Sequence, residues 1–181
     1  MKTIASMSQA ELAAYVQSAL RKEGIDAVLT GGAVVALYSH GKYVSMDLDL
    51  VDQGFASTQK IKKAMEGLDF KRKGRHYSHP DSQYLVEFVA PPLSVGNEPV
   101  AEVVDIKLST GTLRVLSPTD CVKDRLAAFF YWSDRQSLEQ ALLVAKAQKV
   151  KLKEIERWSK AEKMADKYQE FVTRLKKKKS S

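Results

Sequence analysis

The sequence has few of the residues that build covalent or metal-bound scaffolds. Its 181 residues include one cysteine, Cys121, and three histidines. A single cysteine excludes an internal disulfide and fits a reducing cytoplasm. The histidines and the cysteine do not form the spacing of a zinc site. Cys121 falls in a predicted helix, where we interpret it as a small core residue rather than a nucleophile.

Long apolar runs are also missing. No stretch of about 18 apolar residues occurs, so we expect no transmembrane helix and no membrane partner. Residues 1–6 lack the apolar core of a signal peptide. The sequence contains no Gly-x-x-x-x-Gly-Lys-Ser/Thr motif, which excludes a P-loop kinase. The apolar share of 44% still suits a globular core, in one domain with or without a helical appendage.

Positive charge is unevenly distributed along the chain. Residues 1–148 hold seventeen basic and seventeen acidic residues, whereas residues 149–181 hold twelve basic and five acidic, which accounts for the net charge of +7. One interpretation is a solvated helix with a frayed lysine tail at 176–179. The other is attraction to RNA, DNA or another polyanion. A lysine tail alone carries no specificity.

Periodicity predicts alternating helices and strands. Ser8 and Glu11 form the signature of a capping box, and Gly24 ends the helix that follows. A loop is expected over 74–82, and an irregular loop over 91–97. Helices are expected over 8–23, 32–39 and 56–68, from Ser117-Pro118, from Ser133-Asp134, and over 152–175. Strands are expected over 26–30, 44–51, 70–73, 84–89, 102–108 and 113–116.

Two glycines and two aspartates lie close together in this pattern. Asp47 and Asp49 are two positions apart in a predicted strand, so their side chains point to the same face. Two like charges are costly there unless a cation such as Mg²⁺ (or Mn²⁺) lies between them. Gly31 and Gly32 permit close backbone approach, and a helix opening after them would aim N–H groups at a phosphate. The alternative is a solvated strand end.

These residues resemble the signature of a known superfamily. Gly31-Gly32 followed by Ser45-x-Asp47-x-Asp49 resembles the polymerase-β-type nucleotidyltransferases. The segment LTGGAVVALYSHGKYVSMDLDLV is similar to small bacterial AbiEii-type toxins, and the resemblance covers roughly residues 25–145. It implies an α+β fold, with a mixed, mostly antiparallel sheet and flanking helices. We expect a nucleotidyltransferase-like core at 1–116 and a helical region with a basic tail at 117–181.

The resemblance also implies a third strand carboxylate. Glu87 lies in the apolar run 84–89, where a buried, unpaired carboxylate would be expensive. Polymerase-β-type enzymes use a carboxylate at this place, so Glu87 is the candidate third metal ligand or base. Asp105 is the rival, because it also lies within a predicted strand. A surface-facing Glu87 is the alternative.

Further phosphate contacts are expected from basic residues. The segment LSPTDCVKDRLAAFFYWSDRQSLEQALLVA is similar to the helical region after the core of AbiEii-like proteins. On this resemblance Lys123 would reach a nucleotide phosphate, although it could equally be an ordinary exposed helix lysine. Lys42 and Arg135 are additional phosphate candidates.

The implied function is Mg²⁺-dependent transfer of a nucleotide from a nucleoside triphosphate to a hydroxyl acceptor. Asp47, Asp49 and Glu87 would hold metal, Gly31-Gly32 would hold phosphates, and Ser45 would orient a phosphate or the metal-bearing strand. The acceptor could be RNA, such as a tRNA end, as for toxin relatives, with an antitoxin as partner protein. The alternative from another class is a catalytically silent regulator that binds nucleotide or a partner. A plain nucleic-acid-binding module would need exposed strand aromatics, which these strands lack.

Overall fold

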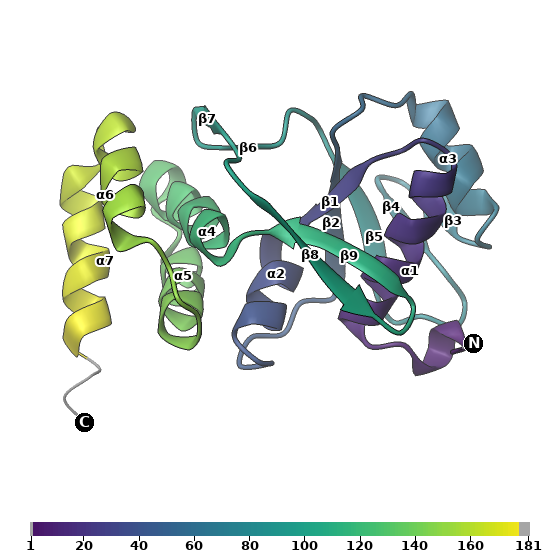
Figure 1. The fold of residues 1–181 in the computed structure, drawn as a ribbon, viewed down its shortest axis with the longest axis horizontal. Helices are drawn as coiled ribbons and strands as arrows, with labels where there is room; N and C mark the ends of the chain where they lie inside the picture. Colours follow the sequence, from purple (N-terminus) through teal and green to yellow (C-terminus); the bar gives the residue numbers. More distant parts are fainter. Residues whose placement is uncertain (1, 178–181) are drawn as a thin grey trace.

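The computed structural model describes residues 2–177. Figure 1 shows an elongated molecule, with the sheet at one end and the helices of residues 118–177 at the other. The helices are α1 Gln9–Lys22, α2 Gly31–Tyr38, α3 Thr58–Glu66, α4 Pro118–Trp132, α5 Arg135–Ala147, α6 Leu152–Ala161 and α7 Ala165–Lys177. The strands are β1 Ala27–Thr30, β2 Asp47–Asp52, β3 Lys71–Lys73, β4 His76–Ser78, β5 Leu85–Val89, β6 Ser94–Val95, β7 Glu98–Pro99, β8 Val103–Leu108 and β9 Gly111–Leu116.

A seven-stranded sheet forms the centre of the molecule, in the order β3-β4-β5-β2-β1-β9-β8. Four neighbouring pairs run antiparallel, whereas β1–β9 and β2–β5 run parallel. This mixed, mostly antiparallel sheet with flanking helices confirms the predicted fold class.

The N-terminal helix α1 begins where the sequence predicted it. The Ser8 hydroxyl accepts a hydrogen bond from the Glu11 N–H, and the Glu11 carboxylate accepts one from the Ser8 N–H at 2.9 Å. This reciprocal cap satisfies two N–H groups that a helix start leaves without partners. Leu12, Val16 and Leu20 are fully buried on one face of α1, which packs on the sheet beside α3.

Two loop predictions were wrong because short strands lie within them. Residues 76–78 form β4, and Tyr77 is buried opposite Val86 of β5. Gly74, with a φ of +62°, reverses the chain between β3 and β4. Residues 94–95 form β6, which pairs with β7. The sequence gives no strand pattern over these polar segments, because each strand is only two or three residues long.

The predicted helix over 152–175 is broken in the middle. Lys163 adopts a φ of +61°, so α6 ends and α7 begins at a new angle. Glu162, just before the break, is buried and accepts hydrogen bonds from the Asn97 N–H and side-chain amide, both at 2.8 Å. No Gly or Pro marks this position. The predicted frayed tail at 176–179 lies partly outside the described residues.

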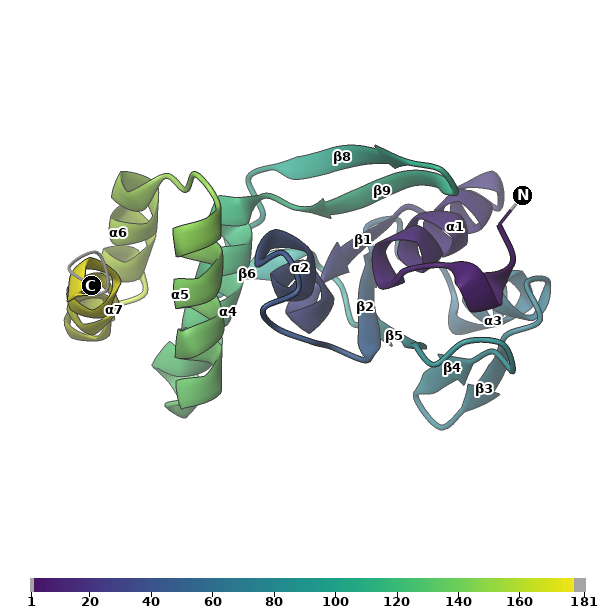
Figure 2. The ribbon, with the colours of Figure 1, turned by 90° about the horizontal axis from the view of Figure 1, so that it is seen from below.

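The helices α4–α7 contact the rest of the described chain through α2, β6 and β9. Figure 2 shows α2 between the strands and the α4–α5 pair, and α2 contacts both helices. The Trp158 indole stacks on Phe130 and donates a hydrogen bond to the Val95 carbonyl at 3.2 Å, which fastens β6 to α6. Cys121 is buried in α4, which confirms its place in the core. Over residues 2–177, no helix is both long and apolar enough to cross a membrane.

Candidate functional site

One row of polar residues crosses five strands on a single face of the sheet. Asp49 lies opposite Glu87 on β5 and opposite Thr30 on β1. On the far side, Glu87 lies opposite His76 of β4, which in turn lies opposite Lys73 of β3. Residues in register share a face, so these five side chains form a continuous line.

Alternation along β2 separates the acidic residues from the core. Leu48 and Leu50 are fully buried on the face that α1 and α3 cover, whereas Asp47 and Asp49 are only partly buried on the other face. The structure therefore brings Asp47, Asp49 and Glu87 to one face of two adjacent parallel strands.

The pKa of Asp49 is affected by burial and by the charged residues around it. Burial raises the pKa of Asp49 to about 6, and the negative charges of Glu87 and Asp47 contribute in the same direction. The positive charge of Arg125 on α4 opposes this rise. Because the Asp49 carboxylate is costly to ionise here, a cation bound beside it would stabilise its charged form.

Gly31 brings backbone directly against Asp49. A Cβ added at Gly31 would lie 2.2 Å from the Asp49 Oδ2, and Gly31 has a φ of +71°. No other residue type fits both the space and the conformation. A Cβ at Gly32 would lie 3.1 Å from the Ser45 Oγ. The start of α2 thus contacts both Asp49 and Ser45.

Ser45 organises the entry to β2. Its hydroxyl accepts a hydrogen bond from the Asp47 N–H at 3.3 Å and donates one to the Asp47 carbonyl at 3.2 Å. Gln9, in the first turn of α1, donates to the Ser45 carbonyl at 2.8 Å. Ser45 is therefore fixed to the acidic strand, and its hydroxyl is already engaged.

Glu87 is held by two basic residues from the β3–β4 hairpin. The Arg75 Nε lies 3.2 Å from one carboxylate oxygen, and the His76 Nε2 lies 3.1 Å from the other. Within residues 2–177, no three His, Cys, Asp or Glu side chains converge as a metal-binding group. Asp47 and Asp49 supply the oxygen donors that Mg²⁺ prefers, and Glu87 could join them once it leaves Arg75.

The helical half contributes Arg125 and Asp124 rather than Lys123. Arg125 binds Asp124 through its Nε at 3.0 Å and reaches Gln140 of α5 at 3.3 Å. Lys123 is 2% exposed and points to α6, with its Nζ 2.8 Å from Glu154. Lys123 also lies 3.6 Å from Asp120, and the structure does not bring it to the carboxylates.

Three other predicted residues lie away from this row. Lys42 is exposed in the turn after α2. Arg135 is exposed at the start of α5, pairs with Glu170 and lies over the Phe129 ring. Asp105, the rival third carboxylate, is exposed on β8, where Arg114 Nε contacts it at 3.3 Å. The edge position of β8 separates Asp105 from Asp49 by two intervening strands.

Several residues at the site carried no signal in the sequence. The sequence predicts a polar loop over Arg75 and His76, yet both side chains contact Glu87. Thr30 donates a hydrogen bond to the Asp49 carbonyl at 3.2 Å. Arg125 could have been found only from its position on the helix, because it lies two residues beyond Lys123.

Comparisons with known proteins identify the fold but no close relative. No protein-family model matches the chain, and no curated protein sequence matches it. An antigenic nucleotidyltransferase-like protein from Paracoccidioides brasiliensis has a similar structure, with a TM-score of 0.57 and 14% identity over 77% of this chain and 75% of that one. ANT(2″)-Ia, solved in complex with adenylyl-2″-tobramycin, gives a TM-score of 0.51 and 15% identity over 93% of this chain and 99% of that one.

At this identity the likeness concerns the fold alone. The chain has the nucleotidyltransferase fold, as the sequence predicted. The resemblance to AbiEii-like proteins, the division at residue 116 and the chemical roles of the site residues stay predictions.

Proposed function

We propose that this protein is a divalent-metal-dependent nucleotidyltransferase whose reaction centre is the acidic row around Asp49. One observation carries the proposal: Asp49 and Glu87 lie in register on adjacent strands, with Gly31 backbone against Asp49 where no side chain fits. A nucleotidyltransferase fold with this arrangement combines acidic oxygens with backbone N–H groups at a helix start. Those are the groups that hold a metal and a triphosphate.

Each residue then has a distinct task. Asp47 and Asp49 would hold Mg²⁺ or Mn²⁺, with Glu87 joining them or taking the proton of the acceptor hydroxyl. When bound, the metal supplies charge neutralisation at the phosphates and lowers the pKa of a coordinated hydroxyl. Gly31 and Gly32 would present their N–H groups to phosphate oxygens, strengthened by the dipole of α2.

The bond changes follow from the substrate. The acceptor oxygen bonds to the α-phosphorus of the triphosphate, the bond to pyrophosphate breaks, and the hydroxyl proton passes to Glu87 or water. Arg125, which lies near Asp49 and across from the sheet, would balance the negative charge of the triphosphate. Catalysis by positioning and charge neutralisation requires no covalent intermediate.

The acceptor class is a hydroxyl-bearing molecule, for which we favour RNA, such as a tRNA end. The resemblance to AbiEii-like toxins and the net charge of +7 support this choice, with an antitoxin as partner protein. The alternative to RNA is a small-molecule acceptor, since ANT(2″)-Ia was solved with an adenylylated small molecule.

A second candidate function is a silent relative that binds nucleotide without transferring it. The observation that favours it is Glu87, whose two oxygens are occupied by Arg75 and His76. A permanent contact there would leave only two carboxylates for metal. The protein would then act as a nucleotide- or partner-binding regulator.

The deciding experiment is incubation of the purified chain with each labelled nucleoside triphosphate, Mg²⁺ and total RNA. We expect label to appear on RNA and pyrophosphate to be released. Asp49→Asn should abolish transfer, whereas Asp105→Asn, on the far edge of the sheet, should retain it. Mg²⁺-dependent ATP binding by calorimetry without transfer to any acceptor would establish the silent alternative instead.

A further inference from the structure

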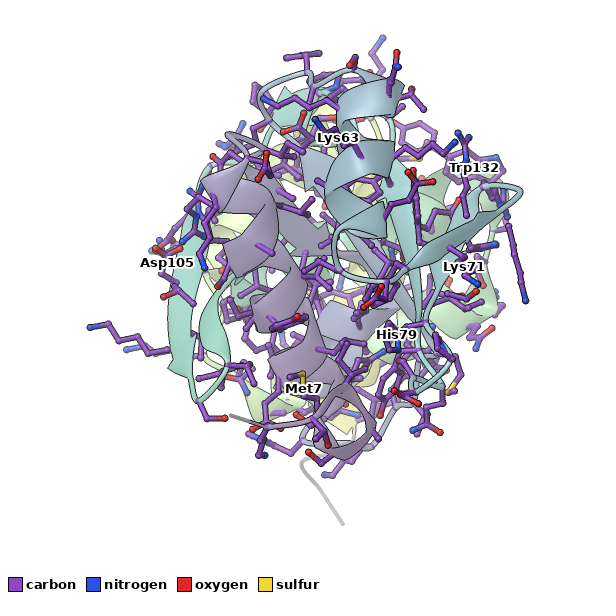
Figure 3. All side chains as sticks on the ribbon, turned by 90° about the vertical axis from the view of Figure 1, so that its right-hand side faces the viewer. Met7, Lys63, Lys71, His79, Asp105 and Trp132 are labelled. Atoms are coloured by element: carbon purple, nitrogen blue, oxygen red, sulfur yellow. The ribbon has the colours of Figure 1, made fainter. Side chains whose placement is uncertain are left out.

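The β3–β4 hairpin carries a cluster of positive charge that the function above does not use. Residues 58–78, which form α3 and this hairpin, contain seven basic and two acidic residues, an excess of five against the excess of seven in the C-terminal segment. The rest of residues 1–148 holds ten basic and fifteen acidic residues. Figure 1 shows α3 and β3 at the same end of the molecule, and Figure 3, which views that end, labels Lys63 of α3 and Lys71 of β3. Residues 1–148 therefore contain a basic region of their own, although their net charge is zero.

The lysines of β3, and not those of α3 on the opposite face of the sheet, lie beside the acidic row. Lys71 and Lys73 are two residues apart on β3, so both point to the face that carries Asp49 and Glu87. Both are exposed, and neither forms an ion pair with any other described residue. Adjacent strands lie about 4.8 Å apart, so Lys73 is roughly 14 Å from Asp49 along the row.

Arg75 links the two regions. Its side chain is 80% exposed, yet its Nε reaches Glu87 at 3.2 Å. An anion arriving at the hairpin could compete with Glu87 for this guanidinium. Occupation of the hairpin by phosphate would thereby release the carboxylate toward Asp49.

We propose that Lys71, Lys73 and Arg75 form a docking surface for the phosphate backbone of a nucleic-acid strand, whose terminal hydroxyl is the acceptor at Asp49. The inference rests on the proposed function for the identity of that hydroxyl. A strand of a few nucleotides spans the distance from the hairpin to the acidic row, which a single small anion does not. A membrane surface is too broad to enter a row that runs across the sheet toward α4.

Edge-strand lysines have a second known role, because charge on an edge strand prevents strand-to-strand aggregation. That role requires no ligand and predicts no binding. The two explanations differ in the salt dependence of nucleic-acid binding.

The test is fluorescence anisotropy of the full chain with a fluorescein-labelled single-stranded RNA, a DNA of the same sequence, and vesicles of anionic phosphatidylglycerol, without nucleotide. The variant is K71Q/K73Q, and the matched control is K22Q/K107Q, which removes two exposed lysines from α1 and β8. At about 50 mM salt we expect K71Q/K73Q to weaken RNA binding about tenfold and to reduce the salt slope by about 1.4, which corresponds to two lost contacts on a single strand. The control should stay within about twofold, since its charges lie off the row.

Binding of RNA, of DNA or of both with this loss supports the surface, because backbone contacts do not require a 2′-hydroxyl. Equal weakening in both double variants, binding to vesicles alone, or no binding by the parent chain would overturn it. RNA binding that depends on the hairpin, without nucleotide transfer, would refute the proposed function and support the docking surface. Nucleotide transfer to RNA that K71Q/K73Q does not affect would support the proposed function and refute the docking surface.

Discussion

Arg75 Nε lies 3.2 Å from the Glu87 carboxylate, so a basic side chain from the hairpin contacts the third acidic residue of the row. His76 occupies the other oxygen at 3.1 Å. Under the proposed function, Glu87 would have two alternatives, a cation from its own chain or a metal shared with Asp49. The balance between these contacts would distinguish the proposed active transferase from the silent alternative.

Removing this competitor should strengthen metal binding. We expect Arg75→Gln to tighten the Kd for Mn²⁺ or Mg²⁺ about threefold, since an exposed ion pair contributes up to about 1 kcal/mol. Calorimetry at low salt measures the change. Arg72→Gln is the matched control, because Arg72 bonds the Gly74 carbonyl in the same hairpin without contacting Glu87. Unchanged or weaker binding in Arg75→Gln would show that Glu87 takes no part in holding metal.

The raised pKa of Asp49 predicts a pH-dependent stability. The folded value is about 6 and the unfolded value is near 4, so the folded state binds this proton more tightly. The stability that the proton on Asp49 contributes is fully present below about pH 4 and is lost as the pH rises through about 6. Asn resembles the protonated form, so Asp49→Asn should be more stable than the parent by about 1–3 kcal/mol near pH 7.5 and equal to it near pH 4.

Urea unfolding across this pH range measures that difference. Asp81→Asn is the control, because Asp81 is exposed in the loop before β5. A stability gain in Asp49→Asn that does not vary with pH would contradict the assigned cause. Saturating Mg²⁺ should reverse the order near pH 7.5, since the parent carboxylate gains a ligand that Asn cannot hold.

The contact between Gly31 and Asp49 can be tested with two glycine variants. Gly41 has a φ of +77° with nothing within 4 Å of an added Cβ, whereas Gly31 has a φ of +71° and an Asp49 oxygen at 2.2 Å. Gly41→Ala should cost about 1 kcal/mol through backbone strain alone. Gly31→Ala should cost at least about 2 kcal/mol more, because the clash is added to the strain.

A double-mutant cycle isolates that clash. In an Asp49→Ala background the carboxylate is gone, so the extra cost of Gly31→Ala should fall by about 1 kcal/mol or more. Chemical unfolding of the four proteins gives the coupling. Additive effects would mean that the two residues do not contact each other in solution.

Much of the fold could be predicted from the sequence because its signals are local. The capping box at Ser8, the proline at the start of α4 and the alternation of β2 each depend on neighbouring residues. The approach of Gly31 to Asp49 could be anticipated because one short helix and one turn join them. Their chemical roles stay predictions.

The remaining features depend on contacts between distant residues. No Gly or Pro lies at the break at Lys163. Glu162, just before the break, accepts a hydrogen bond from Asn97, which lies 65 residues earlier in the chain. Strand β4 is only three residues long and is stabilised by Tyr77 packing opposite Val86. Lys123 and Arg125 differ by two positions, which turns a helix by about 200°, so only one of them can face the sheet. Sequence similarity selected the lysine, whereas tertiary packing presents the arginine.

The buried position of Lys123 makes a final prediction that separates structure from catalysis. Its Nζ lies 2.8 Å from Glu154 and 3.6 Å from Asp120, and Asp120 is itself buried. Lys123→Met would leave the buried Asp120 carboxylate without its cation, whereas Glu154 would keep its pair with Arg157 at 2.8 Å, so we expect a loss of about 3 kcal/mol in the free energy of unfolding. Lys160→Met removes the cation of an exposed pair with Glu156 and should cost less than about 1 kcal/mol. At a temperature where Lys123→Met remains folded, its KM for the nucleotide should match that of the parent. A large rise in KM with unchanged stability would instead place Lys123 at a phosphate.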